Sequence, residues 1–238
     1  MNASVFSQSF KEVEILLKSL EILQQKGVKN INKDGVSIEF KKASQEDSYK
    51  KIHSTALEKF DYDFLLEDQS FFQFQYENAI NKKTLPNIRY AYFQNPQGFK
   101  TYLDFLHEQN LSNDEIEEIG DSWRNEYEQF LTEMELNVSA TTIRFDVESD
   151  FSRYKPLIHS NAHLHIGHKT DIRIPFDKII TPLQFVFFVL KHTDYNKWKE
   201  NIEKNSLFVS MLIKEKKKAT VLSSTFFANG EKDDIYLI

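Results

Sequence analysis

The sequence predicts an α+β fold in which a mainly antiparallel sheet is packed with helices and the N-terminal part is helical. Several short segments alternate apolar and polar side chains, as half-buried strands do. Other stretches repeat apolar residues at helical spacing. The chain has no internal repeat, low-complexity tract or linker rich in Pro and Gly. We therefore expect a single domain over residues 1–238, with residues 1–30 as a helical N-terminal subregion.

The first elements follow from capping and alternation. Ser9 and Glu12 have the spacing of a capping box, and apolar residues then recur at helical spacing as far as Gly27. Residues 36–40 alternate apolar and polar side chains, which predicts a strand. Residues 41–59 are polar and charged, and predict either a surface loop or an exposed helix.

The middle of the chain predicts two aromatic strands and an acidic helix. Residues 71–76 and 88–93 alternate aromatic side chains with others. An aromatic sheet face can stack on bases, but we favour a buried core because alternating aromatic residues are typical of one. Residues 99–109 are predicted to be helical, and Ser112 with Glu115 caps a long helix to about residue 135, whose carboxylates form a solvated face.

The next segments predict a strand and a hairpin. Residues 140–147 form a strand that carries Arg144 and Asp146 on one face, and residues 162–174 form a hairpin that turns at 167–170. If Leu164 and Ile166 face the core, the period of two places polar side chains together on the opposite face. These side chains are His163, His165, Asp171 and Arg173.

The C-terminal part is mainly helical. Thr181 and Pro182 fit an N-cap and a first helical position, and residues 183–190 are apolar enough for a buried helix. A further helix is expected over about residues 196–217, broken near Asn205. A last pair of strands is expected around residues 229 and 230, ending at residues 235–238.

Composition limits the classes of protein. The chain has no Cys, which excludes disulfides, thiolate zinc sites and Cys nucleophiles, and fits the cytoplasm. No apolar run approaches the roughly 18 residues that cross a bilayer, and no basic segment precedes an apolar one at the N-terminus. We therefore expect neither a secreted nor a membrane protein. Phosphate-binding Gly loops, dinucleotide fingerprints and Ser elbows are absent from the sequence.

The net charge of −6 conceals a basic segment. Residues 151–218 carry 13 Lys and Arg against 6 Asp and Glu, a net charge of +7. This asymmetry would favour binding to a phosphate-bearing partner. The alternative is that the distribution of charge along the chain is uneven by chance and has no function. The lysines predicted to contact nucleic-acid phosphates are Lys169, Lys214, Lys216, Lys217 and Lys218. A solvated helix end is the commoner explanation for the last four.

Four of the seven histidines lie within residues 159–168, and two chemistries suit them. In metal-free cleavage of a phosphodiester, His163 and His165 act as acid and base, with Arg144 and Arg173 on the phosphate and Asp146 orienting an imidazole. In a metal site, His163 and His165 bind the ion with a third ligand, for which His159, Asp146 and Asp171 are the candidates.

The arginines favour the metal-free chemistry, because fixed positive charge beside a cation is unfavourable unless an anionic substrate lies between them. A third alternative is that these histidines lie on a solvent-exposed face of the sheet and have no function. The other histidines, His53, His107 and His192, are isolated and are predicted to lie on helix surfaces or at caps. His168 is expected in the hairpin turn.

Six segments of the chain resemble a bacterial family catalogued as domain of unknown function 2290. They are residues 68–74, 89–93, 144–146, 162–167, 173–175 and 181–185. The resemblance implies a helicase encoded alongside and a role in anti-phage defence, but it supplies no mechanism. Arg-x-Asp followed by His-x-His is also similar to a pattern in small toxin-like families suspected of acting on RNA. His159 and His168 match no motif of the family.

We therefore expect a cytoplasmic, nucleic-acid-directed effector that acts with a helicase, as a metal-independent nuclease or phosphodiesterase that prefers RNA and needs no cofactor. One alternative is a non-enzymatic adaptor that docks on the helicase and recognises nucleic acid or a phage product. The other is a metallohydrolase that uses the same histidines with a divalent metal. The sequence leaves the substrate, the phage trigger and the oligomeric state open.

Overall fold

The computed structural model describes residues 1–29, 35–46, 48–81, 84–97, 100–109, 111–133, 140–228 and 230–231. Its centre is a seven-stranded antiparallel sheet in which the strands lie side by side in chain order. The strands are β1 (Leu23–Lys26), β2 (Phe64–Leu66), β3 (Phe71–Glu77), β4 (Asn87–Phe93), β5 (Thr142–Val147), β6 (Ala162–Ile166) and β7 (Arg173–Pro175). Two further strands, β8 (Lys178–Ile179) and β9 (Thr220–Val221), pair with each other. The predicted α+β class is confirmed.

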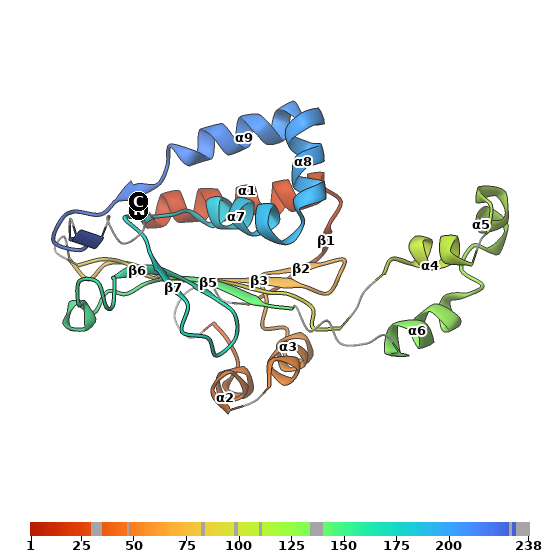
Figure 1. Ribbon diagram of the computed structural model, residues 1–238, viewed down its shortest axis with the longest axis horizontal. Helices are drawn as coiled ribbons and strands as arrows, with labels where there is room; N and C mark the ends of the chain where they lie inside the picture. The colour runs from red at the N-terminus through yellow and green to blue at the C-terminus, as the bar shows by residue number, and fades with distance from the viewer. Residues whose placement is uncertain are drawn as a thin grey trace.

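The helices form three groups around this sheet (Figure 1). One face is covered by α1 (Ala3–Ser19) and α7 (Pro182–Thr193), with α8 (Tyr195–Lys204) and α9 (Ser206–Lys216) outside them. The other face carries α2 (Ile38–Glu46) and α3 (Tyr49–Glu58). A helical arm, made of α4 (Tyr102–Glu108), α5 (Asn113–Ile119) and α6 (Arg124–Glu133), stands away from the body between β4 and β5.

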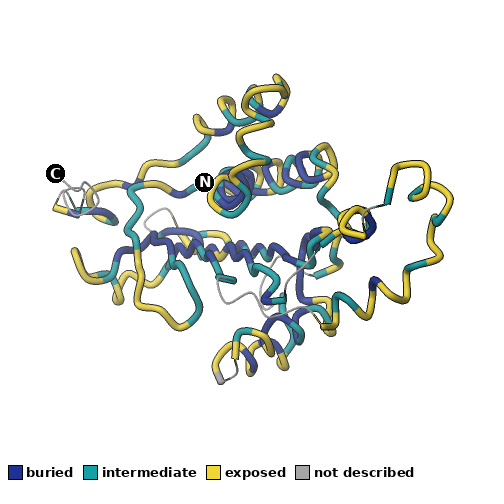
Figure 2. Tube along the Cα trace, turned by 45° about the vertical axis from the view of Figure 1, so that its right-hand side comes forward, coloured by how far each residue is buried: buried dark blue, intermediate teal, exposed yellow. Residues whose placement is uncertain are grey.

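The main core lies between the sheet and the pair α1 and α7, where Figure 2 shows the buried parts of the chain. Phe72, Phe74 and Tyr90 are fully buried there, and the ring of Phe185 on α7 packs against all three. Burial of a Phe side chain removes enough apolar surface from water to be worth about 3 kcal/mol. The prediction that the aromatic strands form a core is therefore confirmed.

The first helix begins earlier than predicted, and Ser9 does not cap it. Asn2 is the N-cap, and its side chain accepts a hydrogen bond from the amide of Val5. Ser9 is buried inside α1, where its hydroxyl donates to Glu215 at 2.9 Å. The helix ends at Ser19 because the following residues pair with β2 as strand β1, a tertiary contact that helical periodicity does not reveal.

The predicted strand at residues 36–40 is wrong, because α2 begins at Ile38. The hydroxyl of Ser37 accepts the amide hydrogen of Phe40 at 3.1 Å, which is a capping contact. Phe40 and Ala43 are then buried three residues apart, on one helical face. For residues 41–59 the helix alternative is correct, since α2 and α3 occupy most of this range, but the helices are not simply exposed, because Ala43, Ile52 and Ala56 are buried in one cluster with Phe71 of the sheet.

The predicted long acidic helix consists of two helices. The capping box of Ser112 and Glu115 is confirmed, but α5 ends at Ile119. The next residue, Gly120, is its C-cap, with a φ of +50° in the left-handed region that favours glycine. The C-terminal helices agree better with the prediction: Thr181 caps α7 with Pro182 in its first turn, and Asn205 separates α8 from α9. Of the predicted last strand pair, residues 229 and 232–238 lie outside the described residues.

Candidate functional site

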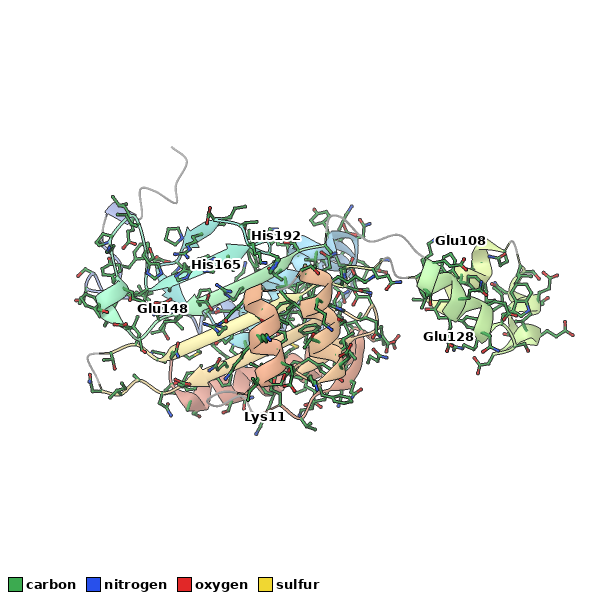
Figure 3. The ribbon with its side chains drawn as sticks, turned by 90° about the horizontal axis from the view of Figure 1, so that it is seen from below. Lys11, Glu108, Glu128, Glu148, His165 and His192 are labelled. Atoms are coloured by element: carbon green, nitrogen blue, oxygen red, sulfur yellow. The ribbon has the colours of Figure 1, made fainter. Side chains whose placement is uncertain are left out.

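A patch of charged side chains and histidines lies on the face of the sheet opposite α1 and α7. It consists of Arg89 on β4, Arg144 and Asp146 on β5, His163 and His165 on β6 and Arg173 on β7, and is called the polar face below. Neighbouring strands align its members directly, because Arg89 pairs with Asp146, Asp146 with His163, Arg144 with His165 and His165 with Arg173. Figure 3 looks onto this side of the sheet, where His165 and Glu148 are labelled on the part that α2 and α3 leave uncovered.

Alternation explains why these side chains converge. Phe145 and Leu164 are buried in the main core, so Arg144, Asp146, His163 and His165 must point to the opposite face. The predicted convergence therefore holds, with one exception. Asp171 is exposed and lies before β7 begins at Arg173, so it does not join the polar face.

Asp146 is the centre of the polar face. Its side chain is 8% exposed, and its Oδ2 lies 2.6 Å from Nε of Arg144 while its Oδ1 lies 3.2 Å from Nε of Arg89. The Nε2 atoms of His165 and His163 lie 3.5 Å and 4.0 Å from Oδ2. A single carboxylate thus faces several cationic or basic groups, with Arg173 beside His165. Because the positively charged side chains outnumber the one carboxylate, the polar face is suited to bind an anion.

His163 is held in one orientation beneath this surface. It is 3% exposed, and its Nδ1 lies 2.8 Å from the carbonyl oxygen of Ser160. Because a carbonyl only accepts, Nδ1 carries the proton of the neutral ring and Nε2 keeps a lone pair directed towards Asp146. Burial lowers the pKa of His163 below its ordinary value, so the ring is neutral near pH 7. It therefore has the protonation state of a general base.

His165 lies beside His163, with ring centroids 4.7 Å apart and ring planes at 78°. Burial, followed by the positive charge of Arg144, lowers its pKa to about 4. An anion bound between Arg144 and Arg173 would offset their positive charge and so raise the pKa of His165. His165 is thus a weak base in the free protein and becomes an acid only with an anion beside it.

The same residues also have the composition of a metal site. Among the described residues, two groups of three place their ligand atoms within 4.8 Å of one another. One group is Asp146, His163 and His165, and the other is Glu148, His159 and His163. Neutral imidazoles and a carboxylate suit zinc and similar ions. The first group is opposed by Arg144, whose guanidinium contacts the carboxylate oxygen that faces both imidazoles.

Two parts of the site were missed by the sequence reasoning. Arg89 has the correct parity on β4, but only the register of β4 with β5 places it beside Asp146. Glu231 is fully buried and accepts hydrogen bonds from the hydroxyls of Ser160 and Tyr154, the latter at 2.6 Å. It thereby fixes the segment whose Ser160 carbonyl holds His163. No local pattern could reveal this contact, since Glu231 lies 71 residues from Ser160.

The predicted lysines lie in different places. Lys169 is exposed in the turn between β6 and β7. Lys214, Lys216 and Lys217 are exposed at the end of α9, on the opposite side of the sheet from α2 and α3 (Figure 1). Lys218 forms ion pairs with Glu12 at 2.8 Å and with the buried Glu215 at 2.6 Å. The structure therefore does not bring the α9 lysines to the polar face.

The isolated histidines differ in their surroundings. His107 and His192 lie in the last turns of α4 and α7, as the prediction of helix surfaces or caps requires. His53 does not lie on a surface: it is 4% exposed, and its ring packs against Phe71. The prediction failed there because α3 packs on the sheet through the side that carries His53.

A family model described as an uncharacterized conserved protein, DUF2290, matches residues 16–236. The chain belongs to this family. The matched range contains every strand of the sheet, so the polar face lies within the DUF2290 domain. Neither the curated proteins nor the solved structures gave a match. In the part of the chain that the structure describes, no helix has the length and apolar character that a membrane crossing requires.

Proposed function

We propose that this protein is a nucleic-acid-directed effector that cleaves RNA at the polar face without a metal ion, and that it acts with a helicase in anti-phage defence. The observation that carries the proposal is the pairing of His163 and His165 beside one carboxylate and three arginines. The helicase and the role in defence rest on the family resemblance, which implies both.

The arrangement supports transfer of protons around a phosphodiester. Arg144 and Arg173 flank His165 from the neighbouring strands and would hold the phosphate by charge-assisted hydrogen bonds. Nε2 of His163 would take the proton from a ribose 2′-hydroxyl, and Asp146 would stabilise the resulting imidazolium. The 2′-oxygen would attack phosphorus while the bond to the 5′-oxygen breaks.

His165 would complete the reaction as the acid. The bound phosphate raises its pKa, and the protonated ring then gives its proton to the departing 5′-oxygen. The products are a 2′,3′-cyclic phosphate and a 5′-hydroxyl, so one proton is taken and one is given in each cycle. DNA lacks the 2′-hydroxyl and would not react by this route.

The test is cleavage of 5′-labelled single-stranded RNA by the purified protein in the presence of EDTA. We expect products that end in a 2′,3′-cyclic phosphate, no cleavage of DNA of the same sequence, and a loss of about 100-fold or more in rate for His163→Ala and for His165→Ala. His107→Ala removes an exposed imidazole on the helical arm and serves as the matched control. Phage protection in cells that also express the helicase should fall with the two site variants. Full protection with both histidines replaced would contradict the catalytic role and favour the adaptor.

A metallohydrolase is the second candidate, and the donor group of Asp146, His163 and His165 favours it. Elemental analysis of untagged protein separates the two candidates. Stoichiometric zinc, manganese, nickel or iron, with cleavage that EDTA abolishes and 3′-hydroxyl products, would support the metal site. Activity that survives EDTA with cyclic phosphate products would support the proposal above.

A further inference from the structure

A groove of about 550 Å³ opens beside the polar face, between α2 and strands β3 to β5. It shares Arg89 and Arg144 with the polar face, so the two are continuous. Its volume lies in the range of sites that hold a molecule as large as a nucleotide. A strand of nucleic acid with a phosphate at His165 therefore has room for a neighbouring nucleotide in this groove.

Beside Arg89, the wall of the groove on β3 and β4 carries the polar side chains of Gln75, Glu77 and Asn87. Gln75 and Glu77 lie two residues apart on the same face of β3, and Asn87 on β4 pairs with Glu77. The amide groups of Gln75 and Asn87 both donate to the carboxylate of Glu77, at 3.4 Å and 3.3 Å. Hydrogen-bonding groups of this kind suit the edge of a base, whereas the neighbouring Arg89 and Arg144 suit a phosphate.

The hydrogen-bonding capacity of this wall is biased towards acceptors. Glu77 can only accept, and Gln75 and Asn87 each direct one of their two amide hydrogens at its carboxylate, so each amide keeps its carbonyl oxygen and a second N–H. Guanine is the base whose Watson–Crick edge carries two adjacent donors, N1–H and the 2-amino group. A carboxylate accepts such a pair of parallel donors in the way that it accepts the two donors of a guanidinium.

We infer that the groove binds a guanine base of a single-stranded nucleic acid, with Glu77 as the reading residue and Gln75 and Asn87 as its supports. The inference rests on the proposed function for the position of the adjoining phosphate. A single strand is required because bases in a duplex turn their Watson–Crick edges to each other, and proteins read such edges in unpaired RNA. Phe40 on α2 and the preceding Val36 line the opposite side of the groove.

The test measures binding and does not depend on cleavage. Fluorescein-labelled RNA decamers, one of uridines alone and three with a single guanosine, adenosine or cytidine at the fifth position, are titrated by fluorescence anisotropy. The protein is the full chain with His163→Ala and His165→Ala, so that the RNA stays intact. We expect the guanosine decamer to bind at least about fivefold more tightly than the other three, and a blunt duplex of the same sequence not to compete.

Glu77→Gln replaces one acceptor oxygen by a donor and should remove the preference for guanosine while the affinity for the uridine decamer changes less than twofold. Glu128→Gln, which neutralises an exposed carboxylate on α6, is the matched control and should keep the preference (Figure 3). Equal affinity for all four decamers, or a preference that survives Glu77→Gln, would overturn the inference. Either result leaves the cleavage proposal intact. Absence of cleavage by the unmodified protein, with guanosine preference retained, would overturn the proposed function alone.

Discussion

His53 is predicted to make the protein lose stability as the pH falls below 6.5. The imidazole is on the side of α3 that packs on the sheet and is buried there, and its Nε2 lies 2.9 Å from the carbonyl oxygen of Gln69, to which it donates when neutral. Burial lowers the pKa of His53 to about 4. The unfolded chain binds the proton at the ordinary pKa of about 6.5, well before the folded protein does. Stability from this residue is therefore complete above pH 6.5 and is lost progressively between pH 6.5 and 4.

The size of the effect follows from the two pKa values. A difference of about 2.5 between them corresponds to about 3 kcal/mol when the loss is complete, at pH values below 4. At pH 5, the unfolded chain is almost fully protonated at His53 and the folded protein is largely neutral there, so about 2 kcal/mol is lost relative to pH 7.5. This is a large fraction of the 5 to 15 kcal/mol that stabilises a typical domain.

The measurement is urea denaturation of the protein and of His53→Gln at half-unit steps from pH 5 to 7.5. Gln keeps an N–H donor for the Gln69 carbonyl but does not titrate, so the difference between the two curves isolates the proton of His53. We expect that difference to change by about 2 kcal/mol over this range. His107→Gln is the control, since it removes an exposed imidazole. Parallel curves for the protein and His53→Gln would refute the reasoning.

Three further substitutions have defined outcomes. Asp146→Asn removes the charge that faces both histidines, and we expect RNA cleavage to slow by about 100-fold or more while circular dichroism shows a folded protein. Glu231→Gln replaces a carboxylate oxygen, which accepts hydrogen bonds from hydroxyl groups, by an amide group that donates. The free energy of unfolding, measured by urea denaturation, should fall by about 1–3 kcal/mol. The His163 imidazole signals in NMR spectra should also shift, because the Ser160 carbonyl that holds this ring would move. Gly27→Ala puts a methyl carbon 1.8 Å from the carbonyl oxygen of Tyr62, and the backbone movement that follows should lower the free energy of unfolding by about 1–3 kcal/mol in the same assay.

The strands were predictable where burial of one face imposes alternation. β3, β4, β5 and β6 each turn one row of side chains into the main core, and their sequences carry that period. Residues 36–40 show the limit of this reasoning, because five residues can fit both a period of two and a helical period. There the Ser37 cap and the packing of α2 on the sheet decide for a helix. Long-range packing, absent from any local pattern, also ends α1 at Ser19.

Strand parity and one hairpin were enough to bring five residues of the polar face together. His163, His165 and Arg173 follow from the hairpin, and Arg144 and Asp146 from the alternation of β5. Arg89 and Glu231 needed knowledge of which distant segments pair, since they lie 57 and 71 residues from the residues that they contact. The parts of the site that sequence reasoning missed are thus the parts that fix Asp146 and His163 from outside the hairpin.

The low pKa of His165 has a consequence for the order of events at the polar face. In the free protein the ring is neutral at pH 7, because burial and Arg144 both oppose a positive charge on it. A phosphate between Arg144 and Arg173 supplies the negative charge that favours the protonated ring. Protonation of His165 would therefore follow binding, and the acid would form only in the complex.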